Sequence, residues 1–204
     1  MKKTQCHSLR MNFTFLVALL AAVCLAEGAT TIENDRYKVD IEAADGSFAI
    51  TTKPGGKKVL PAGKLSGTGG TAKIVELDDK NFGKGQGVEI AYPNGNREVV
   101  ALHPGLPFVT FRSILRNNGN EPVVLNHVPT VSAAVDLGLP PTEITTLGTG
   151  GLFPPDKNPG SYVFLGVVDP KTRSGVVGGW LTHDRGSGVV FSSIENGSAR
   201  LQAQ

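Results

Sequence analysis

The sequence has few cysteines, few aromatic residues and no cluster of like charge. Its two cysteines, Cys6 and Cys24, both lie within the first 26 of 204 residues. If that segment is removed, no thiol remains, which excludes disulfides, thiolate zinc sites and a cysteine nucleophile. Aromatic residues make up only 6% of the chain. With no basic cluster either, nucleic acid is not expected as a partner.

The N-terminal segment has the three parts of a secretory signal peptide. Basic residues Lys2, Lys3 and Arg10 precede an apolar run over residues 13–26, and small residues lie at its end. The run has about 14 residues, whereas a helix needs about 20 to cross a bilayer. No second apolar run of that length follows. We therefore expect no stable membrane span.

Residues 1–26 are accordingly expected to be a cleaved leader of a secreted or periplasmic protein. Cleavage after Ala26 and cleavage after Gly28 both fit the small-residue pattern, so the mature chain is expected to begin near 26–29. The whole chain has a net charge of +2, with 20 Lys and Arg against 18 Asp and Glu. Without the three basic residues of the leader, 17 basic residues face 18 acidic ones, a net charge of −1. The basicity of the whole chain therefore comes from its targeting segment.

Residues 30–204 have the pattern of one all-β domain, an antiparallel β-sandwich. Short β-branched or aromatic runs alternate with polar residues and are separated by Gly, Pro, Asn and Asp. The clearest hairpin joins residues 37–42 to residues 48–52 through Asp45-Gly46. Further strands are expected over residues 72–77, 88–92, 97–102, 108–115, 123–135, 162–168, 175–182 and 188–193.

Other segments lack this alternation. Residues 53–70 are expected to form a long surface loop, residues 83–87 part of a solvated turn, and residues 137–160 a long excursion. Residues 199–204 resemble the start of a strand that has no partner. We therefore expect a domain truncated at its C-terminus, with an exposed edge and poor solubility.

One polar segment is a candidate carbohydrate contact. Trp180, the only tryptophan, is followed closely by His183, Asp184 and Arg185. Tryptophan can stack on a sugar ring, while Asp and Arg form hydrogen bonds to its hydroxyls. The alternative is that Trp180 fills the sandwich core and the polar residues after it form a hairpin turn.

No catalytic residue, metal site or cofactor is expected. His183 and Asp184 are neighbours on a predicted strand, so their side chains would point to opposite faces. The histidines His103, His127 and His183 fall on different predicted elements. Three imidazoles could hold zinc, but without a closely spaced pair we expect independent histidines.

Two segments carry a family resemblance. Residues 115–125 read as strand, Asn-Gly turn and strand, and residues 162–183 end in Gly-Gly-Trp-Leu-Thr-His. Together they resemble the N-terminal β-supersandwich of alpha-galactosidase-like (melibiase) glycoside hydrolases. In that family a catalytic (β/α)8 barrel follows and supplies the aspartate nucleophile and the acid/base of a retaining mechanism.

The resemblance implies a non-catalytic accessory domain of a secreted glycoside hydrolase, whose loops contribute to the sugar-binding cleft. Residues 180–185 are the first candidate for that contact, and residues 152–162, which end in Tyr162, are the second. The expected partners of the domain are carbohydrate and the catalytic barrel of the parent protein, and the chain alone is expected to have no hydrolase activity. A stand-alone carbohydrate-binding or surface-interaction module is the first alternative. A structural envelope protein is the second.

Overall fold

The computed structural model describes residues 28–157, 159–184 and 186–204, so the proposed leader lies outside the described residues. The described chain is all-β and antiparallel, which confirms the fold class predicted from alternation. Its two 3-10 turns are η1 (Pro141–Glu143) and η2 (Pro155–Lys157). Within the described ranges, no helix is long and apolar enough to cross a membrane.

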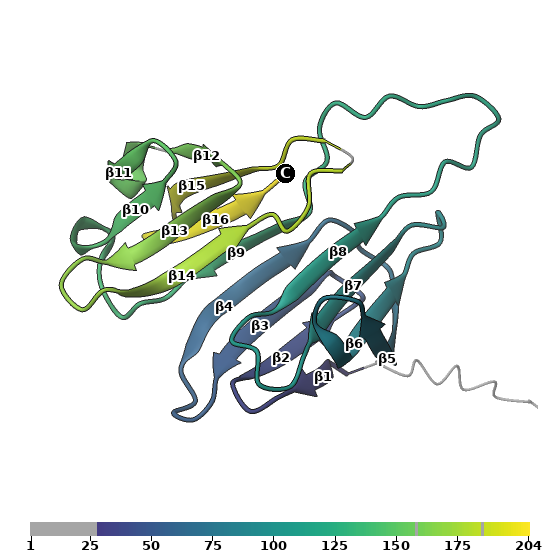
Figure 1. Ribbon diagram of the computed structural model, residues 1–204, viewed down its shortest axis with the longest axis horizontal. Coiled ribbons are helices and arrows are strands. Elements are labelled where there is room, and N and C mark those ends of the chain that lie inside the picture. Colours follow the sequence, from purple (N-terminus) through teal and green to yellow (C-terminus); the bar gives the residue numbers. More distant parts are fainter. Residues whose placement is uncertain (1–27, 158, 185) are drawn as a thin grey trace, which may run out of the picture.

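Eight strands form one large sheet in the order β1-β2-β3-β4-β9-β16-β15-β12 (Figure 1). Their bounds are β1 (Thr30–Glu33), β2 (Tyr37–Glu42), β3 (Ser47–Thr52), β4 (Lys58–Leu65), β9 (Val131–Val135), β12 (Gly160–Tyr162), β15 (Val189–Glu195) and β16 (Ser198–Ala203).

Two four-stranded sheets complete the sandwich. The first small sheet has the order β5-β6-β7-β8, and the second has the order β11-β10-β13-β14. The first contains β5 (Thr71–Asp79), β6 (Gly83–Ala91), β7 (Arg97–Leu102) and β8 (Thr110–Ile114). The second contains β10 (Thr145–Gly148), β11 (Gly151–Phe153), β13 (Phe164–Asp169) and β14 (Ser174–Gly179).

Each small sheet packs on one half of the large sheet and closes its own core. The first core joins β1 to β4 with the first small sheet, and the second joins β9, β16 and β15 with the second small sheet. Ala133 belongs to the first core and Val135 to the second. Because residues two apart on a strand share a face, both small sheets cover the same face of the large sheet. They lie side by side in Figure 1.

The first hairpin forms as its alternation predicts. Val39 and Ile41 on β2 and Phe48 and Ile50 on β3 are all buried, and the two strands pair antiparallel. Gly46 has a φ of +70° in the connecting turn, a conformation that glycine adopts without steric cost. Burying four large apolar side chains stabilises the fold by roughly 1.5–3 kcal/mol each.

The surface loop predicted for residues 53–70 is wrong in part, because β4 lies within it. β4 lacks a regular alternation of apolar residues, in part because a glycine, Gly63, lies beneath the ring of Phe48. A Cβ at position 63 would come within 3.0 Å of that ring. The neighbouring strand thus supplies the core side chain that β4 lacks, and glycine permits its close approach.

The solvated turn predicted for residues 83–87 is also wrong, because these residues begin β6. Gly85 lies beneath His103 and Gly87 beneath Leu77. Their missing side chains leave room for those of neighbouring strands, as in β4. The excursion over residues 137–160 contains β10 and β11 and both 3-10 turns.

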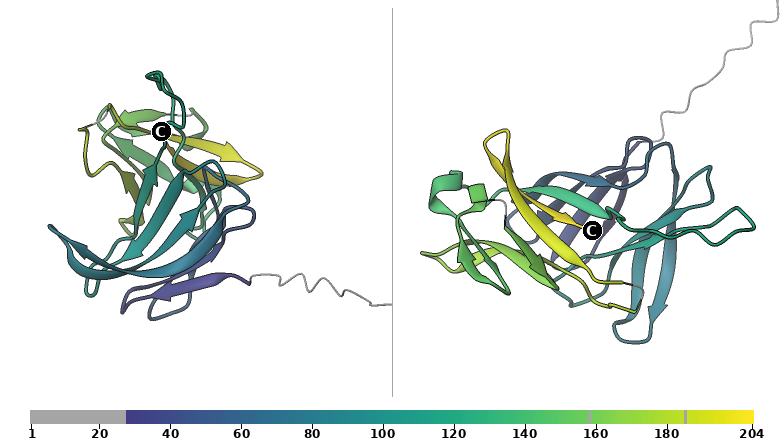
Figure 2. Two further views of the ribbon diagram at one scale, coloured as in Figure 1. Left: turned by 90° about the vertical axis from the view of Figure 1, so that its right-hand side faces the viewer. Right: turned by 90° about the horizontal axis from the view of Figure 1, so that it is seen from above.

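The strand predicted over residues 123–135 is shorter than expected, since only β9 at its end pairs. The connection between β8 and β9 extends beyond the sheets (Figures 1 and 2).

The predicted unpaired last strand is corrected by the topology. β16 pairs antiparallel with β15 on one side and with β9 on the other. Leu201 and Ala199 on this strand are buried in the second core. Because β16 is an interior strand, the poor solubility expected from an exposed edge at this position loses its physical basis.

Candidate functional site

A corner between two sheets brings Tyr162 close to the Trp180 segment. Tyr162 ends β12 in the large sheet, and Phe164 begins β13 in the second small sheet. Val163 between them donates its N–H to Gly188 O (3.2 Å) and accepts from Trp180 N (2.7 Å). Residues about 20 positions apart in the chain therefore meet at one corner of the sandwich. Tyr162 is 64% exposed there.

Trp180 is half-buried and packs against the second core. Its indole Nε1 donates to Val189 O at 3.3 Å. The ring covers Gly188, where a Cβ would come within 3.0 Å of the indole carbons. Trp180 thus closes one end of the core, as the alternative interpretation expected, while its backbone N–H bonds to Val163 next to Tyr162.

The polar residues after Trp180 form the exposed connection between β14 and β15. His183 Nδ1 accepts from Gly188 N at 3.3 Å, which ties the two ends of this connection together. Asp184 is exposed, and no hydrogen bond or ion pair of its side chain is found in the described part of the chain. Arg185 lies outside the described residues.

Val163 has a φ of +72°, which for a β-branched residue costs on the order of 1–2 kcal/mol. Glycine accepts this φ but adds roughly 0.5–1 kcal/mol of backbone entropy to the unfolded chain. Val163 is 43% exposed, so little packing is lost. We expect Val163→Gly to raise the free energy of unfolding by about 0.5 kcal/mol, measured by urea denaturation.

Val177→Gly is the matched control for this prediction. Val177 is also an exposed valine, 66% accessible, but it lies within β14 and is not among the residues with positive φ. Glycine there should lower stability by up to about 1 kcal/mol, because it weakens a strand without relieving strain. If both variants lost stability alike, the corner at Val163 would not be strained.

The three histidines occupy different environments. His103 is buried against Phe82, with a ring centroid separation of 5.5 Å, and its Nδ1 has no hydrogen-bond partner among the described atoms. His127 contacts the side chain of Gln204, and His183 is bonded to Gly188. Across the described ranges, no group of three or more His, Cys, Asp or Glu residues is arranged to hold a metal ion.

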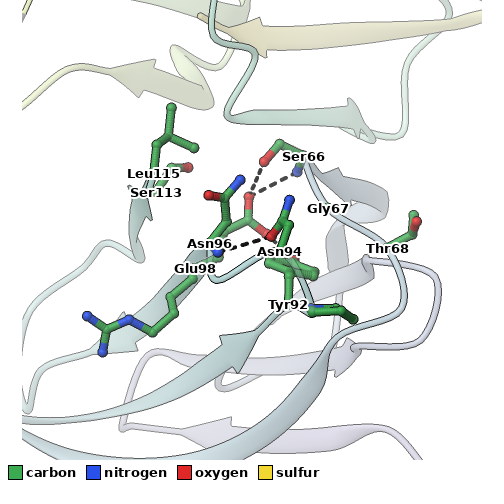
Figure 3. Close-up of a pocket in the computed structure, with 11 residues that line it drawn as sticks. Ser66, Gly67, Thr68, Tyr92, Asn94, Asn96, Glu98, Ser113 and Leu115 are labelled. Atoms are coloured by element: carbon green, nitrogen blue, oxygen red, sulfur yellow. Dashed lines mark hydrogen bonds between the residues drawn. The ribbon is translucent and has the colours of Figure 1, made fainter. Parts of the chain in front are cut away.

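A polar pocket in the other half of the sandwich was not predicted from the sequence (Figure 3). Glu98 lies on its floor and is only 3% exposed. Its carboxylate accepts from Ser66 N at 3.1 Å and from Ser66 Oγ at 2.5 Å. The hydroxyl of Tyr92 donates to its other oxygen. Three donors therefore compensate this buried charge.

Burial and the hydrogen bond to Glu98 raise the pKa of the Tyr92 hydroxyl well above its usual range. The folded chain therefore keeps this proton where the unfolded chain has lost it. A raised pKa in the folded state contributes stability at neutral pH that is lost as pH rises above about 10. Glu98 shares its strand face with Val100 and Leu102, both buried. An acid in an otherwise apolar, core-facing row was the sequence signal for this site.

Comparisons of this chain with protein-family models, with curated proteins and with solved structures find no match. The fold and the geometry of the two sites are therefore the observations from which function is inferred.

Proposed function

We propose that this chain is the non-catalytic N-terminal β-sandwich of a secreted alpha-galactosidase-like glycoside hydrolase. In this proposal it supports carbohydrate binding by a barrel elsewhere in the parent protein. The observation that carries the proposal is the corner where exposed Tyr162 meets the Trp180 segment through Val163. An exposed aromatic ring at a corner that also carries exposed polar residues suits a sugar, which presents both apolar ring faces and hydroxyls.

The two layers of the fold also support the proposal. A large sheet covered by two smaller ones is a β-sandwich, the architecture that the resemblance implies. Residues 162–183, which carry the more distinctive part of that resemblance, contain β13 and β14 and have both ends at the corner. Loops at the end of a rigid sandwich are common positions for binding residues.

Tyr162→Ala is the direct test of the carbohydrate contact. The probe is galactomannan, a polymer with α-linked galactose side chains, and the measurement is affinity electrophoresis or calorimetry with the exported chain. We expect at least a tenfold loss of affinity, about 1.4 kcal/mol. The free energy of unfolding should change by less than about 0.5 kcal/mol, because Tyr162 is exposed.

Val177→Ala is the control, since Val177 is an equally exposed apolar residue, 66% accessible, on β14. It should bind galactomannan as the parent chain does. Equal binding by all three proteins, or no binding by any of them, would contradict the proposed contact.

A stand-alone carbohydrate-binding module is the second candidate, favoured by the polar pocket at Glu98, which lies in the half of the sandwich away from the corner. Reading the genomic sequence beyond the codon for Gln204 separates the two. Barrel-like βα repeats with paired aspartates support the hydrolase domain. An unrelated downstream sequence together with glycan binding supports the module.

A further inference from the structure

A pocket of about 350 Å³ opens between the end of β4 and the inner face of β7 and β8. A second hollow of about 540 Å³ adjoins it around Tyr92, Asn96, Arg97 and Leu115, which line both. The smaller pocket falls within the size range of small-molecule sites, roughly 300–1,000 Å³. Polar and apolar atoms contribute about equally to its lining, and Figure 3 shows the side chains of Ser66, Asn94, Asn96 and Glu98 close together.

Hydrogen-bond donors at the rim come from two asparagines held in fixed positions. Asn94 Oδ1 accepts from Asn96 N at 3.0 Å, and Asn96 Oδ1 accepts from Arg116 N at 2.9 Å. Asn118 Nδ2 donates to Asn94 O at 2.6 Å and joins this turn to the next. Both Asn94 and Asn96 thus use their oxygens structurally. Within the described ranges, neither side-chain NH2 group has a hydrogen-bond partner.

The floor of the pocket offers an acceptor instead. A carboxylate has about four lone-pair positions, and Ser66 and Tyr92 occupy three of those of Glu98. One acceptor position remains, and the negative charge of Glu98 disfavours an anionic ligand. Arg97 at the rim is already paired with Glu89, at 3.2 Å. The hydroxyl of Ser113 can both donate and accept.

We propose that this pocket binds one unit of a neutral polyhydroxylated ligand, such as a single sugar ring. Each hydroxyl of such a ligand can accept from an asparagine NH2 and donate to Glu98 or Ser113, which matches donors and acceptors that lie side by side. An anionic ligand would match only the donors, and a cationic ligand only the acceptors. The pocket adjoins the first core, whereas Trp180 packs against the second, so it is a site separate from the corner at Tyr162. Its assignment rests on the proposed carbohydrate binding and adds a second place for it.

Asn96→Asp tests the pocket with little change in shape. The aspartate keeps the oxygen that accepts from Arg116 N and replaces the NH2 donor by an acceptor. The probe is galactose, followed by ligand-observed NMR and by the side-chain amide signals of Asn94 and Asn96. The parent chain should bind with a dissociation constant of about 1–10 mM, as expected for a small polar ligand. Asn96→Asp should weaken binding at least tenfold.

Asn81→Asp is the charge control, because Asn81 lies in the exposed turn between β5 and β6 and the change adds the same negative charge. It should leave galactose binding unchanged. Phosphate serves as an anionic probe and is expected not to shift the amide signals. Urea unfolding of each variant verifies that it is folded, and Ser113→Ala replaces Asn96→Asp if that variant does not fold.

Binding of phosphate but not galactose would overturn the assignment of ligand class, and absence of binding by either probe would overturn the site. Galactose binding that is unchanged in Asn96→Asp and Ser113→Ala would overturn it as well. Tyr162→Ala, measured in parallel, separates the two sites. If Tyr162→Ala loses galactomannan binding while Asn96→Asp keeps galactose binding, the corner is supported and the pocket is rejected. If Asn96→Asp loses galactose binding while Tyr162→Ala keeps galactomannan binding, the pocket is supported and the corner is rejected.

Discussion

Glu98→Ala is expected to lower the free energy of unfolding by about 3 kcal/mol. The change removes the acceptor for three donors, namely Ser66 N, Ser66 Oγ and the hydroxyl of Tyr92. Tyr92 is itself buried, so its hydroxyl would be left without a partner in the protein. A hydrogen bond to a charged group contributes roughly 1.5–3 kcal/mol, and water entering the pocket offsets part of the loss. Urea denaturation measures the difference.

Glu89→Ala is the control for this change, since Glu89 is a glutamate on the outer face of the neighbouring strand. Its carboxylate pairs with Lys73 at 2.7 Å and with Arg97 at 3.2 Å, and both cations are largely exposed. Such surface ion pairs contribute about 0–1 kcal/mol each. If Glu89→Ala cost as much stability as Glu98→Ala, the buried network around Glu98 would not be what stabilises this end of the sandwich.

Gly188→Ala is expected to be the second most damaging of these changes, with a loss of about 2 kcal/mol, within the usual range for overpacking. Gly188 is buried beneath the indole of Trp180, and its new Cβ would overlap the ring. The indole must move away from the second core and give up its hydrogen bond to Val189 O. Because Trp180 is the only tryptophan, a red shift of the intrinsic fluorescence reports this displacement directly.

Gly186→Ala controls for the loss of a glycine in the same connection. No atom of the described residues lies within 4 Å of a Cβ built on Gly186, and its φ is not in the left-handed region. Stability and fluorescence should therefore match those of the parent chain. An unshifted fluorescence spectrum in Gly188→Ala would show that the ring does not rest on Gly188. Weaker galactomannan binding in that variant alone would connect the position of the indole with carbohydrate contact.

Local signals were sufficient where each strand supplies its own buried side chains. The hairpin of β2 and β3 follows from alternating apolar residues and an Asp-Gly turn, and β7 has the bounds that its alternation predicts, Arg97–Leu102. Local signals failed at β4 and at the start of β6, where glycines lie beneath Phe48 and His103. A strand whose core side chains come from its neighbours shows no alternation of its own.

The candidate site was predictable in its residues but not in its arrangement. Trp180 was singled out as the only tryptophan, followed by polar residues, and Tyr162 was singled out through the family resemblance. Their meeting through the backbone of Val163 depends on the strand switching from the large sheet to the second small sheet. The pocket at Glu98 was missed because Ser66, Tyr92 and Glu98 come from three separate segments.

The sequence by itself determined that the chain is all-β, since the period of two and the turn residues are local properties of neighbouring positions. Only the tertiary structure decided which strands pair and what each buried face contacts. It placed β16 between β15 and β9, and it closed the network around Glu98. The physical reason is that alternation marks which side of a strand is buried, whereas pairing and packing depend on residues far apart in the chain.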